Sequence, residues 1–332
     1  MAQPGNVEAC FATQSAALQA QAQQIRDTAL VELGRELKHE DYHFTAVTPA
    51  THARVNRRPG NERAVSLEGV FGWSRPFPAS LLPKPMFTLM HEAQVIEVCS
   101  EGWRSLVRAS TINDSLLFHS AYPTAQADAV FFGPDSYRFV SVLRQYVAST
   151  TQAKQRVIDV GCGAGPGAIA LACAYPQAQV FATDINQNAL RLAGVNARLA
   201  GAGNIQVQHS NLLDAVEGRF DLIVANPPYL IDPDRRAYRH GGGVLGAALS
   251  LAIVENAMTR LSREGVLVLY TGSAIVDGVD GFLESVRQML GRPGFHWEYT
   301  EMDPDVFGEE LDCPAYATTD RIAAVVLCVR KV

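Results

Sequence analysis

The residues Asn226-Pro227-Pro228-Tyr229 end an apolar run, and their types suit them to hold a planar group that carries a nitrogen atom. Two adjacent prolines stop a strand, because neither can donate a ladder hydrogen bond and each has a fixed φ. Asn226 adds a side-chain amide, and Tyr229 adds a flat aromatic ring. A plain turn would need neither, so the run predicts a binding function. A proline strand terminator with an asparagine cap is the alternative interpretation.

A glycine-rich stretch, VIDVGCGAGPG, lies earlier in the chain. Gly161, Gly163 and Gly165 would let the backbone turn sharply and approach a ligand closely. The stretch then leads into a predicted helix, whose N-terminus favours negative charge. Such a loop by itself is weak evidence, because dehydrogenases and other nucleotide-binding proteins share it.

Two acidic residues narrow the choice of ligand. Asp159 precedes the first glycine, where a carboxylate would repel a pyrophosphate but could pair with an ammonium group. Asp184 ends the next apolar run, 23 residues after Gly161, where an acid can bind ribose hydroxyls. A ligand with an amino-acid end and a ribose end satisfies both acids, so S-adenosylmethionine fits and NAD does not. The alternative is that Asp159 is a buried structural acid and Asp184 a helix cap.

The elements that must position these residues form an alternating pattern. From about Ala125 onward, short apolar runs that end in Gly, Asp or Asn alternate with helical segments. This pattern predicts βαβ units and an α/β fold with a doubly wound parallel sheet, whose ligands bind at the carboxyl ends of the strands. The final segments, FHWEYTEMDP and RIAAVVLCVRKV, predict two more strands, for which an antiparallel pair is one arrangement.

The N-terminal part has a different pattern. Residues from about Cys10 to Glu40 are rich in Ala, Gln, Leu and Glu and predict a helix. Two strands joined at Asn113-Asp114 predict a hairpin. The sequence therefore predicts a smaller mixed α+β domain over residues 1–124, for substrate recognition, and a catalytic domain over residues 125–332.

Composition limits the classes of partner and compartment. The 332 residues carry a formal net charge of -6, which argues against polyanion binding driven by overall charge. A local basic stretch runs from Arg54 to Arg63. The six cysteines lack a Cys-x-x-Cys pair and the histidines lack metal-ligand spacing, so we expect neither a disulfide framework nor a metal site. The N-terminus lacks the features of a secretory signal, and no stretch is apolar for long enough to span a membrane, so we expect a cytoplasmic protein.

Taken in order, the motifs VIDVGCGAG, ATDIN and ANPPY resemble those of the class I S-adenosylmethionine-dependent methyltransferases. More narrowly, they resemble the Asn-Pro-Pro-Tyr amino and amide N-methyltransferases. That group includes the release-factor glutamine, the adenine-N6 and the small-domain ribosomal RNA methyltransferases. The resemblance extends from about Phe131 to Val332 and implies a Rossmann-like, seven-stranded methyltransferase sheet.

The resemblance implies roles for individual residues in cofactor binding. Asp184 would hold the ribose, with Ile185 against the adenine. Asn211 stands where many relatives carry an acid that accepts a hydrogen bond from the adenine amine, and an amide oxygen can also accept it. The segment FFGPDSYRF resembles the one that closes over the cofactor, although it departs from the Pro-Arg-Pro pattern of the glutamine methyltransferases. The residues implied to line the methionine end are Asp159, Gly161, Gly163 and Gly165, and Asn226 also borders the cofactor.

The resemblance also implies how the nitrogen would be methylated. The Asn226 side-chain oxygen and the Pro227 carbonyl would accept the two N–H groups of a planar amide or amine, and Tyr229 would stack on it. Catalysis is then mainly positioning and preorganised electrostatics. The implied substrate contacts are Pro228, Tyr229, Arg235 and Arg239.

The loop after this motif is basic and rich in glycine. Arg235, Arg236, Arg239 and His240 lie just before Gly241-Gly242-Gly243, which we expect to make the loop mobile. Its arginines would meet phosphates or an acidic protein surface, and a solvated charged loop is the alternative. The acidic segment EMDPDVFGEELDCP is predicted to be a solvated loop; shaping the substrate mouth is its alternative role.

These observations predict an S-adenosylmethionine-dependent N-methyltransferase. The leading substrate is a glutamine side chain in a protein of the translation machinery. The close alternative is an adenine or guanine amine in RNA or DNA. A non-catalytic cofactor-binding module used in assembly and a small-molecule methyltransferase stay open as other classes.

Overall fold

The computed structural model describes residues 4–236 and 238–332. Contacts within the chain divide it into two units, Met1–Tyr122 and Pro123–Val332. Substrate recognition by the N-terminal part stays a prediction. Among the described residues, no helix combines the length and hydropathy that a membrane span requires.

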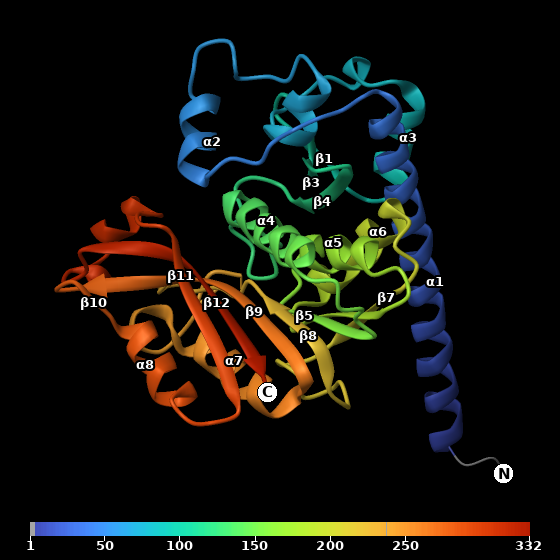
Figure 1. The fold of residues 1–332 in the computed structure, drawn as a ribbon. Helices are drawn as coiled ribbons and strands as arrows, with labels where there is room; N and C mark the ends of the chain where they lie inside the picture. Colours follow the sequence, from blue (N-terminus) through green and yellow to red (C-terminus); the bar gives the residue numbers. More distant parts are fainter. Residues whose placement is uncertain (1–3, 237) are drawn as a thin grey trace. The chain divides into compact units, whose positions relative to one another are not determined.

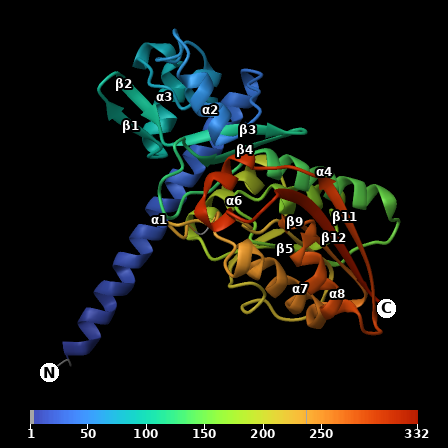
Figure 2. The same ribbon diagram turned by 90° about the vertical axis from the view of Figure 1, so that its left-hand side faces the viewer.

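The first unit combines helices with two short hairpins, which Figure 2 shows as separate pairs of strands. The predicted hairpin at Asn113 is confirmed, and this residue adopts the left-handed conformation (φ 50°) that tight turns require. The predicted helix is confirmed as α1. The elements are α1 (Pro4–His39), α2 (Pro49–Asn56), η1 (Glu68–Gly72), η2 (Ala79–Leu81), α3 (Lys84–Glu92), β1 (Ile96–Cys99), β2 (Gly102–Ser105), β3 (Val107–Ile112) and β4 (Ser115–Ser120).

The core of the first unit forms where α1 meets α3. Leu30, Leu33 and Leu37 are spaced so that they share one face of α1, and all three are fully buried. Met86 and Met90 occupy one face of α3 in the same way. The C-terminal half of α1 therefore holds this unit together.

The second unit is built on one large sheet with the strand order β11-β12-β9-β8-β5-β6-β7, and the short β10 pairs with β9. Strands β7, β6, β5, β8 and β9 are parallel, whereas β12 pairs antiparallel with both of its neighbours, β9 and β11. The predicted doubly wound sheet and its antiparallel final pair are confirmed. The strands are β5 (Arg156–Val160), β6 (Gln179–Asp184), β7 (Ile205–His209), β8 (Phe220–Ala225), β9 (Leu261–Val276), β10 (Val279–Asp280), β11 (Phe295–Asp303) and β12 (Arg321–Lys331).

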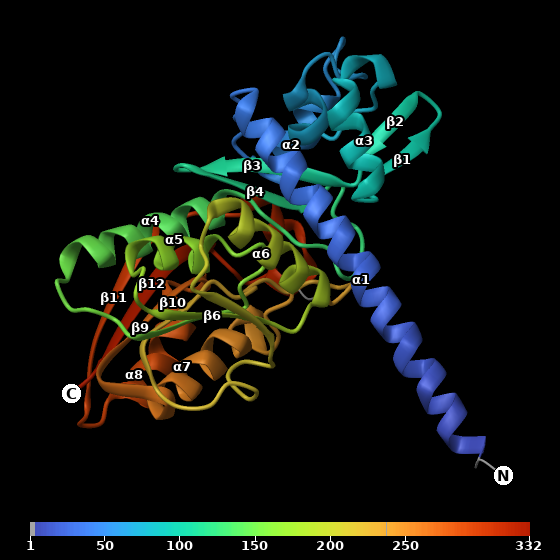
Figure 3. The ribbon, with the colours of Figure 1, turned by 90° about the vertical axis from the view of Figure 1, so that its right-hand side faces the viewer.

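Helices cover both faces of this sheet, with α4, α5 and α6 on one face and α7 and α8 on the other (Figures 1 and 3). Consecutive strand residues point to opposite faces, so Val157 packs in the first layer and Ile158 in the second. The helical elements are α4 (Pro134–Ser149), α5 (Pro166–Ala174), α6 (Gln187–Ala200), η3 (Val244–Gly246), α7 (Ala248–Arg260), α8 (Gly281–Leu290), η4 (Gly308–Asp312) and η5 (Pro314–Tyr316).

The chain order places a topological switch point at β5. From β5 the sheet grows through β6 to β7 on one side, and it then resumes on the other side with β8 and β9. Ligands of doubly wound sheets bind in the crevice that forms where the strand order reverses. The switch point therefore lies between the loop after β5 and the loop after β8.

Candidate active site

Three of the predicted motifs meet at one edge of the sheet. Val160, the last residue of β5, pairs with Thr183 of β6 on one side and with Ala225 of β8 on the other. Because these strands are parallel and in register, the glycine loop, Asp184 and Asn226 all follow at the same level. The structure thus brings together residues from distant parts of the sequence.

The glycine loop is open on one side. Gly161 and Gly163 have positive φ (71° and 53°), and a Cβ atom added to either would meet nothing within 4 Å. Glycine is therefore needed at these positions for the backbone conformation, and the space beside the loop is free for a ligand. Gly165 (φ 85°) also packs closely, because a Cβ atom there would lie 3.3 Å from Ala193 Cβ.

Asp184 ends β6 and holds both the glycine loop and the start of the turn that leads to α6. One of its carboxylate oxygens accepts a hydrogen bond from the Gly163 amide (3.0 Å), and the other accepts one from the Asn186 amide (2.9 Å). Burial raises the pKa of the Asp184 carboxyl above its ordinary value, while these backbone donors oppose the rise. Asn186, not Asp184, caps α6 by accepting from the Asn188 amide (2.9 Å). The alternative role of Asp184 as a helix cap is therefore wrong.

Asp159 lies beneath the loop and is only 2% exposed. Its carboxylate accepts a hydrogen bond from the Ala168 amide in α5 (2.8 Å), and a Cβ atom at Gly167 would come within 2.7 Å of the same oxygen. Burial raises the pKa of the Asp159 carboxyl to about 7. In this structure Asp159 acts as the buried structural acid that the sequence left as an alternative. Its pairing with an ammonium group stays a prediction.

The residues beside the loop fit a nucleoside. Ile185 is 53% exposed although it is a large apolar side chain, and it directly follows Asp184. An apolar surface left open beside an acid suits an adenine ring that lies next to a ribose. Asn211 is also exposed, and its amide nitrogen lies 3.5 Å from Asp214. Together with the open glycine loop, these observations show that the site fits S-adenosylmethionine.

Asn226 is the polar side chain of the motif after β8. It is partly buried, and its amide makes no hydrogen bond to another described residue. A partly buried amide without such a partner is available to a ligand, since buried polar groups are normally bonded. Its predicted role as an acceptor for the substrate nitrogen stays a prediction.

Tyr229 is buried rather than open to a substrate. It is 6% exposed, and its hydroxyl donates a hydrogen bond to Asp135 (2.6 Å). Burial raises the pKa of its phenol well above the ordinary value, so the hydroxyl keeps its proton. A Cβ atom at Gly272 would lie 2.2 Å from the Tyr229 ring, which shows how closely β9 packs against it. Sequence reasoning missed this structural role, and stacking on a substrate stays a prediction.

The segment FFGPDSYRF forms the entry to α4. Asp135 lies in the first turn of this helix and is 7% exposed. Besides Tyr229, it accepts hydrogen bonds from the Tyr270 hydroxyl (2.8 Å) and from Arg138 (3.2 Å). Asp135 was not among the predicted site residues. The resemblance had drawn attention to its segment but not to its carboxylate.

The loop after β8 has backbone hydrogen bonds of its own, and the mobility expected from its glycines stays a prediction. A bridge pairs Leu230 with His240, and the Gly241 amide donates to the Leu230 carbonyl (2.8 Å). A Cβ atom at Gly241 would lie 2.7 Å from the Pro228 carbonyl oxygen, and one at Gly246 would lie 2.0 Å from the Tyr229 carbonyl oxygen. These two glycines therefore permit close packing of the backbone.

Most arginines of this loop already have acidic partners. Arg236 donates to the buried carboxylate of Asp232 (2.9 Å), and this bond raises the pKa of Arg236 and lowers that of Asp232. Arg239 bonds to Glu310 and lies 3.5 Å from Asp232. Arg235 is exposed and has no side-chain bond to another described residue. Of the two arginines predicted to contact the substrate, Arg235 is thus the one whose guanidinium is open to a ligand.

The acidic segment before β12 packs on this loop and is not simply solvated. Phe307 makes an edge contact with the Tyr229 ring (6.0 Å between centroids), and Val306 is buried. The Tyr316 hydroxyl accepts a hydrogen bond from the Ile231 amide (2.8 Å). This part of the chain therefore packs against the motif after β8, and its alternative role in shaping the substrate mouth stays a prediction.

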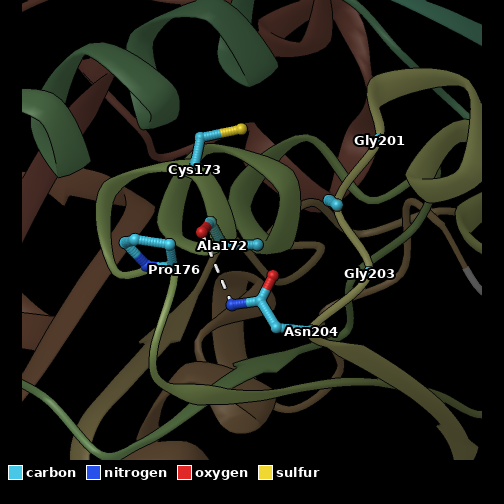
Figure 4. Close-up of a pocket in the computed structure, with 7 residues that line it drawn as sticks. Ala172, Cys173, Pro176, Gly201, Gly203 and Asn204 are labelled. Carbon is cyan, nitrogen blue, oxygen red and sulfur yellow. Dashed lines mark hydrogen bonds between the residues drawn. The ribbon is translucent and has the colours of Figure 1, made fainter.

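A separate hollow lies elsewhere in the second unit (Figure 4). It forms at the C-terminal ends of α5 and α6, which is the opposite edge of the sheet from the glycine loop. The Asn204 side chain donates to carbonyl groups of Tyr175 (3.1 Å) and Ala178 (3.0 Å), so its amide closes the end of α5. This hollow has no part in the site. Its lining residues are Ala172, Cys173, Pro176, Gly201, Ala202, Gly203 and Asn204.

Comparison with known proteins agrees with the geometry. The family model described as methyltransferase small domain matches residues 139–277. The chain is 49% identical over 126 residues to a release factor glutamine methyltransferase of Deinococcus radiodurans. The matched stretch covers 35% of this chain and 45% of that protein. The chain is also 36% identical over 127 residues to a ribosomal protein uL3 glutamine methyltransferase of Neisseria gonorrhoeae. This match covers 35% of this chain and 42% of that protein.

The chain thus spans less than half the length of these two relatives. The matched region contains the glycine loop, Asp184 and the Asn-Pro-Pro-Tyr motif, which are the features that the fold brings to one edge of the sheet. Residues 139–277 therefore resemble the methyltransferase small domain, and the second unit of this chain has the Rossmann-like fold and the motif order of S-adenosylmethionine-dependent methyltransferases.

Proposed function

We propose that this chain is an N-methyltransferase that uses S-adenosylmethionine to methylate the side-chain amide of a glutamine in a protein of the translation machinery. The observation that carries the proposal is the Asn226 amide, which has no described partner and follows β8 at the level of the glycine loop. The names of the relatives, which methylate glutamine in a release factor and in a ribosomal protein, support the substrate class. Translation takes place in the cytoplasm, so the proposal places the enzyme there.

The chemistry requires an oriented nitrogen rather than a strong base. An amide nitrogen is a poor nucleophile because its lone pair is delocalised into the carbonyl group. Bound S-adenosylmethionine supplies an electrophilic methyl group. The Asn226 side-chain oxygen and the Pro227 carbonyl accept the two N–H groups of the substrate and aim its lone pair. The nitrogen can lose a proton after transfer, so catalysis depends on positioning and on fixed dipoles.

The test is methyl transfer from labelled S-adenosylmethionine into a purified peptide-chain release factor and into ribosomal protein uL3. The variant Asn226→Ala, which lacks the predicted acceptor, is the control. We expect the wild type to label one of these proteins at glutamine, as located by mass spectrometry, and Asn226→Ala to label neither. A release factor and a uL3 that both stay unlabelled would refute the glutamine assignment.

A second candidate is an exocyclic amine of adenine or guanine in RNA, and one feature of the first unit favours it. Arg54, Arg57, Arg58 and Arg63 are exposed on α2 and the loop that follows it. Among the described ion pairs of these four, only Arg63 has an acidic neighbour, Glu101, at 4.0 Å. Exposed arginines with few acidic partners suit contacts with phosphates.

One experiment separates the two candidates. Labelled extract is divided into a protease-treated and an RNase-treated half. Label that is lost with protease and kept with RNase supports the glutamine proposal. Label that is lost with RNase moves the assignment to an RNA base.

A further inference from the structure

We propose that Asp135 is a positioning residue for methyl transfer, which holds the acceptor groups of Asn226 and Pro227 in place by binding the hydroxyl of Tyr229. This inference rests on the proposed function. It adds a residue from α4, which the Asn-Pro-Pro-Tyr motif does not contain.

The first observation is that both oxygens of Asp135 are used. Oδ2 accepts from the Tyr229 hydroxyl (2.6 Å), and Oδ1 accepts from the Tyr270 hydroxyl (2.8 Å). Arg138 donates to Oδ1 (3.2 Å) and also to Asp303 Oδ2 (2.9 Å). This carboxylate therefore links α4, the loop after β8 and β9, and through Arg138 it also reaches β11.

The second observation is that the two phenols act as stable donors. Burial raises the pKa of both Tyr229 and Tyr270 above the ordinary value for tyrosine. Each hydroxyl thus keeps its proton at neutral pH. Hydrogen bonds from a hydroxyl to a carboxylate are short and about twice as strong as neutral ones, and their strength falls steeply when the partners are misaligned. Asp135 therefore defines the place of the Tyr229 hydroxyl closely.

The third observation is that the Tyr229 ring is buried and closely packed. Gly272 of β9 lies so close that a Cβ atom there would be 2.2 Å from the ring. Phe307 approaches the ring edge-on, with 6.0 Å between the centroids. Contacts on two sides of the ring and the bond to its hydroxyl therefore restrict the position of this tyrosine.

This position sets the direction of the acceptors. Pro227 and Pro228 separate Asn226 from Tyr229, and proline fixes φ near -65°. A stiff connection transmits any displacement of Tyr229 to the Pro227 carbonyl. A misplacement of about 1 Å in a reacting group can lower the rate of an enzyme about a hundredfold. Loss of the Asp135 bond should therefore act on catalysis without any direct contact between Asp135 and the substrate.

A merely structural role for this carboxylate is the competing explanation, and the chain contains a matched control for it. The Tyr299 hydroxyl donates to Asp280 Oδ2 (2.5 Å), which is another pairing of a tyrosine with an aspartate in the second unit. Tyr299 lies in β11, and neither residue is among those predicted for the site. Removing this hydroxyl tests the cost of losing a bond of the same kind away from the acceptor groups.

The experiment compares Tyr229→Phe, Asp135→Asn, the double variant and Tyr299→Phe in the full chain. For each we would measure kcat and KM for methylation of a purified release factor, the Kd for S-adenosylmethionine by calorimetry, and Tm. We expect Tyr229→Phe and Asp135→Asn to lower kcat by about tenfold or more, with a Kd within about twofold of the wild type. The double variant should be no slower than the slower single variant, because both changes break one interaction. Tyr299→Phe should lower Tm but keep kcat.

Two results would overturn the inference. The first is a kcat for Tyr229→Phe within about twofold of the wild type. The second is a double variant whose loss equals the product of the two single losses, since independent effects multiply.

A separate readout keeps the inference testable if the wild type does not methylate the release factor. Hydrogen exchange of the peptide that covers residues 226–241 should become faster in Asp135→Asn and stay unchanged in Tyr299→Phe. That result would support the positioning role while the glutamine proposal fails. Unchanged exchange in Asp135→Asn would refute the positioning role, whatever the substrate is.

Discussion

At the scale of single residues, burial decides what each polar group of the site can do. Asp159 and Asp184 both accept hydrogen bonds from backbone amides, and burial raises the pKa of each carboxyl. Asp184 borders the open side of the glycine loop, whereas Asp159 lies below it. Asn226 differs from both, because its amide has no described partner. A polar group that the fold leaves unbonded is the one with hydrogen-bonding capacity for a substrate.

Asn226→Ala should remove an acceptor that methyl transfer needs. We expect kcat to fall by about a hundredfold to a thousandfold, which is the range seen when one preorganised polar group is removed from an active site. The Kd for S-adenosylmethionine, measured by calorimetry, should change little. Normal turnover in this variant would show that the amide does not hold the substrate.

Asp184→Ala should have the reciprocal effect on cofactor binding. The carboxylate is predicted to accept from the ribose hydroxyls, and it also holds Gly163 and Asn186 in place. Loss of charged hydrogen bonds of this kind should raise the Kd for S-adenosylmethionine by about tenfold to a hundredfold. Calorimetry on the purified variant measures this Kd, and Asn226→Ala serves as the control that is expected to bind the cofactor normally. An unchanged Kd would mean that the ribose binds elsewhere.

At the scale of elements, the site depends on two irregular segments that support each other. The loop after β8 closes on itself through the bridge between Leu230 and His240. The segment between β11 and β12 then packs on that loop through Phe307, Glu310 and Tyr316. Loops of this kind hold a defined shape because their polar groups are bonded within the fold.

Gly246→Ala should displace the loop after β8. Its added methyl group would lie 2.0 Å from the Tyr229 carbonyl oxygen, and backbone atoms cannot yield as a side chain can. Its φ of 85° adds strain of about 1–2 kcal/mol in any non-glycine residue. We expect methyl transfer to fall by at least about tenfold, with cofactor binding retained.

Gly278→Ala provides the matched control for this prediction. Gly278 also has a positive φ (72°), but a Cβ atom there would meet nothing within 4 Å. The control should lose stability from strain alone and keep its kcat. Equal loss of kcat in both variants would show that backbone strain, and not displacement of the loop, causes the effect.

At the scale of the whole molecule, the two units contain different kinds of buried polar groups. The second unit buries acids next to backbone amides, whereas the first unit buries histidines next to an arginine. His52 and His119 are both fully buried, and the nitrogen Nε2 of His119 lies 2.8 Å from the Ser110 hydroxyl. Burial, followed by the charge of Arg108, lowers the pKa of His52 to about 4 and that of His119 well below its ordinary value.

The first unit should therefore lose stability in mild acid. An unfolded histidine takes up a proton near pH 6.5, whereas the folded His52 resists protonation down to about pH 4. The stabilisation is complete above pH 6.5 and declines as the pH falls from there toward 4. Within this range, the free energy of unfolding falls by about 1.4 kcal/mol per pH unit for each such histidine.

Urea unfolding at pH 7.5, 6 and 5, followed by Trp fluorescence, measures this dependence. His119→Gln should reduce the slope of the free energy of unfolding against pH. It removes one of the two titrating groups, whatever its effect on overall stability. A slope that is unchanged in this variant would contradict the assignment of the acid sensitivity to the buried histidines.

The sequence alone determined the class of fold and predicted which residues meet at one edge of the sheet. Alternating strands and helices, the glycine loop, Asp184 and the Asn-Pro-Pro-Tyr motif are local patterns, and each reflects the conformation of a few consecutive residues. Because parallel strands bring their carboxyl ends to one edge, these local patterns were enough to predict where a ligand binds. The hairpin at Asn113 could be predicted for the same reason.

Only the tertiary structure decided which partners the polar side chains have. Tyr229 bonds to Asp135 across 94 positions of the sequence, and Arg239 bonds to Glu310 across 71. These pairs give Tyr229 and Arg239 partners within the fold, and the substrate contacts predicted for both residues stay predictions. The two pairs form because α4 and the segment after β11 pack on the loop after β8. No local propensity encodes contacts between segments so far apart, since they depend on the order of strands in the sheet and on the packing around it.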